Sequence, residues 1–392
     1  MTDVVVIGGG VIGSAIAYFL ARDPAFDGRV TVVEKDPTYE FSTSARSVAS
    51  IRQQFSTAEN VAISRYGYAF LKDVGTHLAV EGDAPDIQFR DGGYLFLGEE
   101  AHRESFDRTL TIQRDGGAEI DRIEGSDAIG ARFPWMNADD LALAHLGLSQ
   151  EGWFDGYALM RAFRRKASSL GVTYLDREVV SMDRTGDRID AVVLNDGQRL
   201  SAGVFVNASG GRARWTAEMA GIDGLPVSPR KRCVFYCETR ETIPQGLLVI
   251  DSSGTYFRAE GKGFLCGRSP GPGEEDPENT DYDVDYSQFE EYLWPTLAHR
   301  VPAFEAIKQV SAWGCHYAMC LLDANAILGP HPEVANFIFA NGFSGHGMQQ
   351  APAVGRGLAE WIIYGQYRSL DLSPFGYERI LAGRPLEETE VI

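Results

Sequence analysis

Three glycines near the start of the chain have the spacing Gly8-x-Gly10-x-x-Gly13 and directly follow the apolar run 4–7. A buried strand that ends in such glycines and opens a helix lets a pyrophosphate approach bare backbone, while the helix N-terminus stabilises its charge. Glu34 ends the next apolar run about 20 residues later, where a carboxylate can accept hydrogen bonds from a ribose. The pattern predicts a dinucleotide site, and the residues expected to contact the ligand are Gly8, Gly10, Val11, Ile12, Gly13, Glu34 and Lys35.

Glycine-rich segments recur at 208–211 and 342–347, far from the first motif. NAD and FAD both use the N-terminal fingerprint, but a nicotinamide enzyme usually completes its cofactor site within one contiguous domain. A long flavin dinucleotide that spans two domains needs segments from distant parts of the chain. The recurrence therefore favours FAD, with an NAD-linked dehydrogenase as the alternative. For segment 342–347 a purely structural glycine turn also stays open.

If the ligand is a flavin, the late segment has a chemical task. We expect a strand at 337–340, then loop 342–347, then a helix that begins near Pro352, because proline is favourable in a first helical turn. Hydride uptake puts negative charge near N1 and the C2 carbonyl of the flavin ring, and backbone N–H groups at a helix N-terminus stabilise it. These groups would come from Gly345, His346, Gly347, Met348 and Gln349.

Arginine is the expected clamp for an anionic substrate, because six of the 36 basic residues are lysines and a guanidinium binds carboxylates bidentately. Arg52 is the first candidate. Arg258 is the second, since it lies two residues from Tyr256 and therefore on the same strand face. Tyr256 and Tyr317 can hydrogen-bond a substrate, and His346 can donate to the flavin edge. Surface ion pairs, satisfied buried tyrosines and a structural histidine are the alternatives.

Composition excludes several other classes of protein. The chain has 392 residues, 44% of them hydrophobic, and a formal charge of −19, so duplex nucleic acid or an anionic membrane surface would be repelled. Five unevenly placed cysteines with no Cys-x-x-Cys pair indicate neither a disulfide scaffold nor a metal site, and they suit a reducing compartment. No apolar stretch is long enough to span a membrane. We expect a cytoplasmic protein, with homo-oligomerisation open.

The apolar pattern predicts a β-α-β unit over 4–34 and a return to the same kind of buried sheet over 171–211. Between them, residues 86–150 change character, with a strand at 93–97 and a polar helix over 99–114. We interpret this stretch as an insertion away from the nucleotide site. Residues 228–322 are strand-rich and carry a solvated Pro/Gly/acidic loop at 269–285.

Four stretches together resemble the D-amino-acid oxidase superfamily over roughly residues 1–370. They are the glycine motif, segment 41–55 (FSTSARSVASIRQQF), segment 326–332 (AILGPHP) and segment 342–352 (GFSGHGMQQAP). Within the superfamily, IRQQF and GHGMQQAP look like the branch of FAD-dependent oxidoreductase domain-containing proteins, near sarcosine, glycine and opine oxidases.

The resemblance implies FAD and an α/β fold. A doubly wound, glutathione-reductase-like FAD-binding domain would be interleaved with an α+β substrate domain that has a mainly antiparallel sheet. The FAD-binding domain would comprise 1–85, 151–227 and 323–392, and the substrate domain 86–150 and 228–322. The resemblance also implies cofactor contacts at Ser42, Thr43, Ser44, Ala49, Ser50, Val179, Ala208 and Gly210, and Arg46 is a candidate for a cofactor phosphate.

The chain departs from its relatives at positions that matter. Leu265 stands where sarcosine oxidases carry the lysine that promotes reaction with oxygen, and Gln349 replaces the lysine that holds the substrate carboxylate. Ala318 replaces the arginine of glycine oxidases. The cysteine that links to flavin in sarcosine oxidases falls at His316, one residue from Cys315. We expect non-covalent FAD, with covalent attachment through Cys315 as the alternative.

These observations predict an FAD-dependent oxidase or dehydrogenase that oxidises the C–N bond of a small amino acid, N-substituted glycine or opine-like secondary amine. Hydride transfer to flavin N5 would give an imine that hydrolyses. The electron acceptor would be O2 or an electron-transfer partner. The alternative is an FAD-binding assembly or partner-binding protein with little catalytic activity.

Overall fold

A computed structural model describes residues 2–271 and 273–391. Its first large sheet has six strands in the order β19-β20-β13-β1-β2-β9, and all neighbours are parallel except β19 and β20. The central strand β1 pairs with β2 on one side and β13 on the other, which confirms the N-terminal β-α-β unit. The strands are β1 (Val4–Ile7), β2 (Val30–Glu34), β9 (Thr173–Asp176), β13 (Val204–Asn207), β19 (Ile327–Pro330) and β20 (Phe337–Asn341).

Alternation along β1 assigns the two faces of this sheet. Val4 and Val6 belong to the apolar cluster that contains the helices on one face, whereas Val5 and Ile7 belong to the cluster that contains α8 and the β10–β11 hairpin. A strand buried on both faces reads as continuous hydrophobic sequence, which explains the run at 4–7. The helices of the first face are α1 (Val11–Arg22), α3 (Ala58–Lys72), α7 (Gly156–Ser169) and α10 (Gly347–Tyr364), and the opposite face has α8 (Ala213–Met219), β10 (Val179–Thr185), β11 (Arg188–Leu194) and β12 (Arg199–Leu200).

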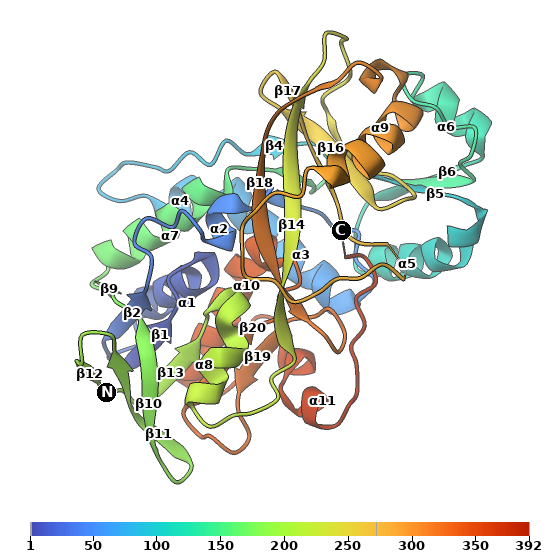
Figure 1. Cartoon of the computed structure of the whole chain (residues 1–392). Coiled ribbons are helices and arrows are strands. Elements are labelled where there is room, and N and C mark those ends of the chain that lie inside the picture. Colours follow the sequence, from blue (N-terminus) through green and yellow to red (C-terminus); the bar gives the residue numbers. More distant parts are fainter. Residues whose placement is uncertain (1, 272, 392) are drawn as a thin grey trace.

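The second large sheet has eight strands in the order β18-β14-β17-β16-β15-β5-β7-β6. Every neighbouring pair is antiparallel except β15 and β5. The long strands β14 and β18 pair along nearly their whole length and run through the centre of the molecule (Figure 1). The bounds are β5 (Gly93–Gly98), β6 (Ile120–Glu124), β7 (Leu143–Gly147), β14 (Val227–Glu238), β15 (Leu247–Ile250), β16 (Thr255–Glu260), β17 (Gly263–Arg268) and β18 (Lys308–Cys320).

Shorter elements complete the fold around these two sheets. The helix α9 (Trp294–Arg300) packs against the eight-stranded sheet through Leu297, and α6 (Ser126–Arg132) does so through Ile129. A small sheet of β3 (Ser50–Ile51), β8 (Gly152–Trp153) and β4 (Arg90–Asp91) connects the two parts. The remaining helices are α2 (Thr43–Arg46), α4 (Val74–Leu78), α5 (Arg103–Asp115) and α11 (Glu378–Leu381).

One predicted boundary and one prediction of burial differ from the structure. The helix expected near Pro352 begins at Gly347, more than one turn earlier, with His346 as its N-cap. The side chains from Met348 onward are already buried, so packing extends the helix even though Pro352 gives up one intrahelical hydrogen bond. The strand at 173–176 is the edge of its sheet and is half-exposed, because only β2 pairs with it.

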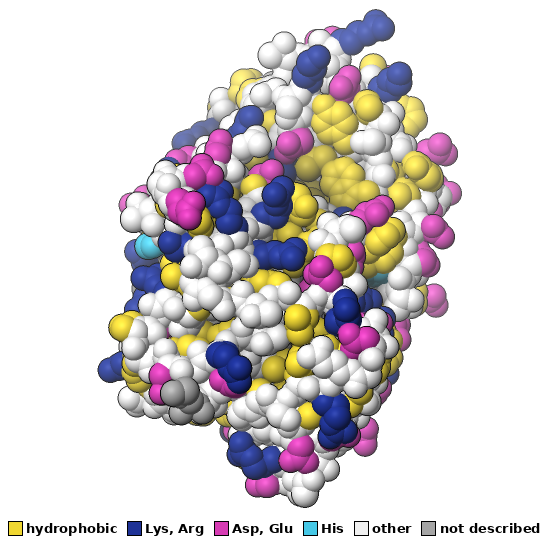
Figure 2. All heavy atoms as spheres, turned by 90° about the vertical axis from the view of Figure 1, so that its left-hand side faces the viewer, with side chains coloured by type: hydrophobic (Ala, Val, Ile, Leu, Met, Phe, Trp, Pro, Cys, Tyr) yellow, Lys and Arg dark blue, Asp and Glu magenta, His cyan; other side chains and the backbone are white. Residues whose placement is uncertain are grey.

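The fold is a mixed α/β architecture with one mainly parallel and one mainly antiparallel sheet. The first sheet draws its strands from 4–34, 173–207 and 327–341, and the second from 93–147 and 227–320. On this basis we propose the domain division 1–85, 151–227 and 323–392 against 86–150 and 228–322. On the face in Figure 2, basic and acidic side chains are interspersed.

Candidate functional site

One cavity of about 1280 Å³ lies between the two sheets and reaches from the glycine motif to Arg52. It is larger than the roughly 300–1,000 Å³ of ordinary ligand pockets, so it has room for a dinucleotide and a substrate together. Most of the residues predicted from sequence line it. They are Gly8, Gly10, Val11, Ile12, Glu34, Lys35, Ser42, Thr43, Ser44, Ala49, Ser50, Arg52, Val179, Ala208, Gly210, Tyr256, Tyr317, Gly345, His346, Gly347, Met348 and Gln349.

Close backbone packing explains the glycines at the first end of the cavity. Gly8 has a φ of +104°, and a Cβ there would lie 2.4 Å from the carbonyl oxygen of Ala208. A Cβ on Gly13 would lie 1.9 Å from the carbonyl oxygen of Gly8. Gly13, predicted as a cofactor contact, is not among the residues that line the cavity, and this close contact lets α1 start tightly against the end of β1.

Small polar side chains surround the start of α1. The Oγ of Ser44 accepts a hydrogen bond of 3.0 Å from the Val11 amide, and the Oγ of Ser42 accepts one of 3.2 Å from the Ser44 amide. The carboxylate of Glu34 accepts from the Gly9 amide at 2.7 Å and the Asp36 amide at 2.9 Å, and burial raises its pKa. These bonds fix Glu34 at the end of β2, where a ribose hydroxyl can reach it.

The N-terminus of α10 forms another wall of the cavity. Gly345 has a φ of +92°, and a Cβ there would lie 2.6 Å from the ring of Tyr317. The first amides of a helix have no partner within the helix, so those after His346 are free to face a ligand. The side chain of Gln349 points back and accepts from the Arg52 amide at 3.1 Å.

Arg52 lies at the far end of the cavity and is only 4% exposed. Its guanidinium donates from Nε to the Gln54 carbonyl at 3.0 Å, and its Nη2 faces His346 Nε2 at 3.3 Å. The guanidinium carbon is 4.5 Å from the ring centroid of Phe55. The structure therefore holds a buried guanidinium at the cavity wall. Besides these dipoles and ring faces, it interacts with the buried carboxyl groups of Glu151 and Glu390, whose pKa values burial raises and the Arg52 charge partly lowers again.

His346 is neutral in this environment. Burial, and to a smaller extent the adjacent Arg52 charge, lower its pKa to about 3, although a hydrogen bond to the Glu390 backbone offsets part of this shift. Burial also raises the pKa of Tyr317 to about 12 and that of Tyr256 well above 10, so both phenols keep their protons. These three groups can donate or accept hydrogen bonds, but none of them carries charge at neutral pH.

Two predicted arginines do not line the cavity. Arg46 donates to the carbonyls of Glu40 and Gly314 and packs against the rings of Phe41 and Tyr282. These contacts tie the end of the Ser/Thr segment to β18.

Arg258 was predicted from its alternation with Tyr256, and it is not among the residues that line the cavity. Its guanidinium turns to the Val48 carbonyl at 2.8 Å, the Ala259 carbonyl and the Glu260 carboxylate. Of the two clamp candidates, only Arg52 faces the cavity.

Sequence reasoning missed three residues at the substrate end. Tyr94, which lies in the segment 86–150 assigned to the substrate domain, lines the cavity. Arg232 also lines it, with its guanidinium 5.2 Å from the Tyr317 ring centroid and in a bidentate pair with Asp276 at 2.8 and 2.9 Å. Neither residue belongs to a motif in the sequence, so nothing there pointed to them.

The third is Glu151, which is buried behind Arg52. It accepts from the Gln53 amide at 2.8 Å and from the Tyr94 amide at 2.9 Å, and burial raises its pKa to about 7. It joins the Arg52 segment to β5. An acidic residue before Gly152 and Trp153 reads as a turn in the sequence, so this role was not visible there.

The residues present fit a flavin dinucleotide. The glycine end admits a pyrophosphate, and Glu34 is placed for a ribose. The buried His316 Nε2 has no hydrogen-bond partner among the described residues and belongs to a cavity-lining side chain beside Tyr282. A polar group of the cofactor would satisfy such an atom.

Comparison with known proteins agrees with this site. The family model described as DAO, FAD dependent oxidoreductase, matches residues 3–361. FAD-dependent oxidoreductase domain-containing protein 1 of Xenopus laevis is 40% identical and covers 100% of this chain and 85% of its own length. Monomeric sarcosine oxidase from a Bacillus species is 23% identical over 99% of both chains.

A solved structure extends the comparison to the whole fold. L-proline dehydrogenase from P. horikoshii superposes with a TM-score of 0.85 at 28% identity, over 98% of this chain and 99% of that one. The chain therefore belongs to the DAO family of FAD-dependent oxidoreductases, whose cofactor is FAD.

Proposed function

We propose that the protein oxidises the C–N bond of a small amino acid, N-substituted glycine or secondary amine that carries a carboxylate. The observation that carries this proposal is a single cavity with the glycine motif at one end and the buried guanidinium of Arg52 at the other. The names of two similar proteins, a sarcosine oxidase and an L-proline dehydrogenase, support a substrate with a secondary amine beside a carboxylate.

Arg52 would bind the carboxylate, because a guanidinium offers paired donors that match its two oxygens. Tyr256, Tyr317 and His346 would hydrogen-bond the rest of the substrate and set the direction of its α C–H bond. Their pKa shifts keep all three side chains uncharged. Arg52 is then the charged group that attracts the substrate carboxylate, and the three neutral side chains orient the rest of the substrate.

FAD, when bound, supplies the oxidant that takes a hydride from the α-carbon at N5. The substrate nitrogen must first be neutral, and a desolvated amine next to Arg52 loses its proton more easily than in water. The product imine takes up water and breaks into a carbonyl compound and an amine. Positioning and electrostatics, not a dedicated strong base, would provide most of the rate enhancement.

FAD would bind non-covalently, since the Cys315 thiol at the cavity wall is buried and keeps its proton. The acceptor would be O2 or an electron-transfer partner, and the chain could act alone or as a homo-oligomer. The five cysteines are free and buried, which suits a cytoplasmic location. Within the described residues, no helix is both long and apolar enough to cross a membrane.

Anaerobic mixing of the purified flavoprotein with a panel of amines tests the proposal. The panel should hold sarcosine, iminodiacetate, L-proline, an opine and D-amino acids, with dimethylamine as the matched compound that lacks a carboxylate. We expect loss of the flavin's visible absorption with at least one carboxylate compound and none with dimethylamine. Retention of full absorption with every compound would reject the proposed reaction and favour a role in assembly or partner binding.

A further inference from the structure

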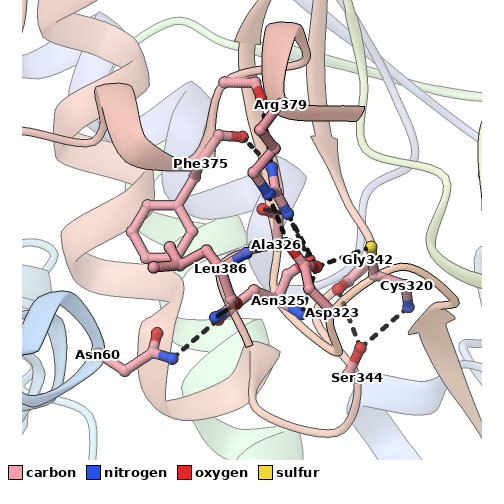
Figure 3. Close-up of polar contacts among 11 residues, drawn as sticks. Asn60, Cys320, Asp323, Asn325, Ala326, Gly342, Ser344, Phe375, Arg379 and Leu386 are labelled. Atoms are coloured by element: carbon pink, nitrogen blue, oxygen red, sulfur yellow. Dashed lines mark hydrogen bonds and ion pairs between the residues drawn. The ribbon is translucent and has the colours of Figure 1, made fainter. Parts of the chain in front are cut away.

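Residues 386–391, here termed the strap, lie beside Arg52 although more than 300 residues separate them in sequence. The strap is anchored at Asp323, which follows β18. The amide of Leu386 donates to Asp323 Oδ2 at 3.0 Å, and the amide of Glu388 donates to the Asp323 carbonyl at 3.0 Å. Arg379 holds the same carboxylate at 2.7 Å, and Asn325 Nδ2 donates to the Leu386 carbonyl at 2.7 Å (Figure 3).

A buried carboxylate fastens the strap a second time, close to Arg52. Glu388 is 4% exposed and accepts hydrogen bonds from the Ser56 amide at 2.8 Å, the Ser56 hydroxyl at 2.7 Å, the Thr57 hydroxyl at 3.1 Å and Asn60 Nδ2 at 2.8 Å. Such a set of donors around one carboxylate is specific, because each bond to an ionised acceptor is stronger than a neutral one. Beyond Glu388 the hold is lighter: the Thr389 amide donates to Ser56 Oγ at 2.8 Å and the Glu390 amide donates to Glu388 Oε1 at 3.1 Å.

Those residues reach the proposed substrate clamp. The carbonyl oxygen of Glu390 accepts a hydrogen bond from Arg52 Nη2, and the ring of His346 bonds to the same backbone. Arg52 and His346 both line the cavity. The strap therefore touches two of the four polar side chains that the proposed function assigns to the substrate.

The geometry of the Arg52 guanidinium determines what a substrate carboxylate must displace in order to bind. A carboxylate can bind bidentately along the edge formed by Nε and Nη2, or along the edge formed by Nη1 and Nη2. Nε is already bonded to the Gln54 carbonyl, and Nη2 faces both His346 and Glu390. Since both edges include Nη2, a bidentate carboxylate has to displace one of its partners.

We propose that the strap is that partner: a substrate carboxylate exchanges with the Glu390 carbonyl at Arg52, and residues 389–391 move aside when it binds. His346 is held at the N-cap of α10, whereas the end of the strap has no helix or strand of its own. The strap would thus regulate access to Arg52. A ligand without a carboxylate cannot replace the Glu390 carbonyl at the guanidinium, so it would bind more weakly than one that has a carboxylate. This inference rests on the proposed function, because it requires Arg52 to bind the substrate carboxylate.

Acetate is a suitable probe, since it presents the carboxylate without an oxidisable amine. We would titrate it into the flavin-loaded protein and follow the perturbation of the flavin spectrum, and in parallel measure hydrogen exchange at the Thr389 and Glu390 amides. The variants are a chain that ends at Glu388, which keeps both anchors, and Glu388→Ala, which removes the second. Glu387→Ala is the matched control, because that side chain is exposed.

We expect the chain that ends at Glu388 to bind acetate about tenfold more tightly, since acetate no longer has to break a hydrogen bond to a charged donor. Glu388→Ala should move in the same direction and Glu387→Ala should not change. Acetate should accelerate exchange at the two amides in the full chain. Equal or weaker acetate binding by the shortened chain, or unchanged exchange, would overturn the exchange mechanism while leaving the clamp intact. Failure of all variants to bind acetate would instead reject Arg52 as the clamp, and the inference with it.

Discussion

The two ends of the cavity are built in different ways. At the dinucleotide end, Gly8, Gly13 and Ser44 act through backbone geometry and short side chains. At the substrate end, Arg52 and His346 are long or ring side chains whose polar atoms are all buried and held by other elements. The first end is a property of one β-α-β unit, whereas the second exists only after β3, β5, β18, α10 and the strap have come together.

This difference implies different sensitivities to mutation. A backbone site fails when a Cβ is added, because carbonyl oxygens cannot move aside. A site made of buried side chains fails when one polar partner is removed, since the remaining partner is left unsatisfied. Mutations at the glycine motif and at Arg52 should therefore fail in different ways.

The largest effect is expected for Gly13→Ala. The new Cβ would lie 1.9 Å from the Gly8 carbonyl oxygen, so α1 and the end of β1 must separate. We expect a protein that purifies without yellow flavin colour and loses at least about 3 kcal/mol of unfolding free energy, measured by denaturant titration. Gly246→Ala is the control, because nothing lies within 4 Å of a Cβ there and its φ is ordinary. Normal flavin content in Gly13→Ala would show that this close contact is dispensable.

Arg52→Ala should impair substrate binding at one end of the cavity and leave FAD binding at the other end intact. Loss of a buried charge-assisted clamp is expected to cost about 3 kcal/mol, which raises KM for the carboxylate substrate more than a hundredfold while FAD stays bound. Arg258→Ala is the matched comparison, since that guanidinium is equally buried but turns to the Val48 carbonyl. Steady-state kinetics should show less than a fivefold change in KM for Arg258→Ala. The reverse order of effects would exchange the roles of the two arginines.

The dinucleotide end of the cavity was easier to predict from the sequence than the substrate end. The run Val4–Ile7, the glycine spacing and Glu34 predicted β1, α1 and β2, because the dinucleotide site is local and its backbone demands particular residue types. The start of α10 was misplaced at Pro352, since tertiary packing of Met348 outweighed the local preference of proline.

The substrate end was predictable only in part. Arg52 was found through its position after a recognisable Ser/Thr segment, but Arg258 had an equally good local pattern and turned away. Tyr94 reaches the cavity because β5 pairs with β15 across more than 150 residues of sequence, and no local pattern encodes that register. Buried partners such as Glu151 become visible only when the donors around them are in place.

A smaller effect, with a defined pH dependence, is expected for Glu151→Gln. The folded pKa of Glu151 is about 7 against an ordinary 4.5, so between these values the unfolded chain has lost the proton and the folded chain keeps it. The contribution of this group to stability therefore falls as pH rises from about 4.5 to 7. Glu151→Gln loses a hydrogen-bond acceptor and should be less stable than wild type at pH 5. Because glutamine does not titrate, its unfolding free energy lacks the fall that Glu151 causes between pH 4.5 and 7. The gap in unfolding free energy between wild type and Glu151→Gln should shrink by up to about 3 kcal/mol from pH 5 to pH 8. Denaturant titrations at several pH values measure it, and a constant gap would contradict the assignment.

The smallest effect is expected for Cys315→Ser, which tests whether chemistry beyond binding fixes the flavin. Covalent attachment through this residue would need the thiolate, yet burial raises the pKa of Cys315 to about 12, so the thiol stays protonated and unreactive. We expect acid precipitation to leave all yellow colour in the supernatant for both wild type and Cys315→Ser, with equal flavin content before precipitation. Colour retained in the wild-type pellet but not in that of Cys315→Ser would mean that the ring end, too, binds the cofactor by a side chain. The contrast between a backbone site for the cofactor and a side-chain site for the substrate would then hold only for the pyrophosphate.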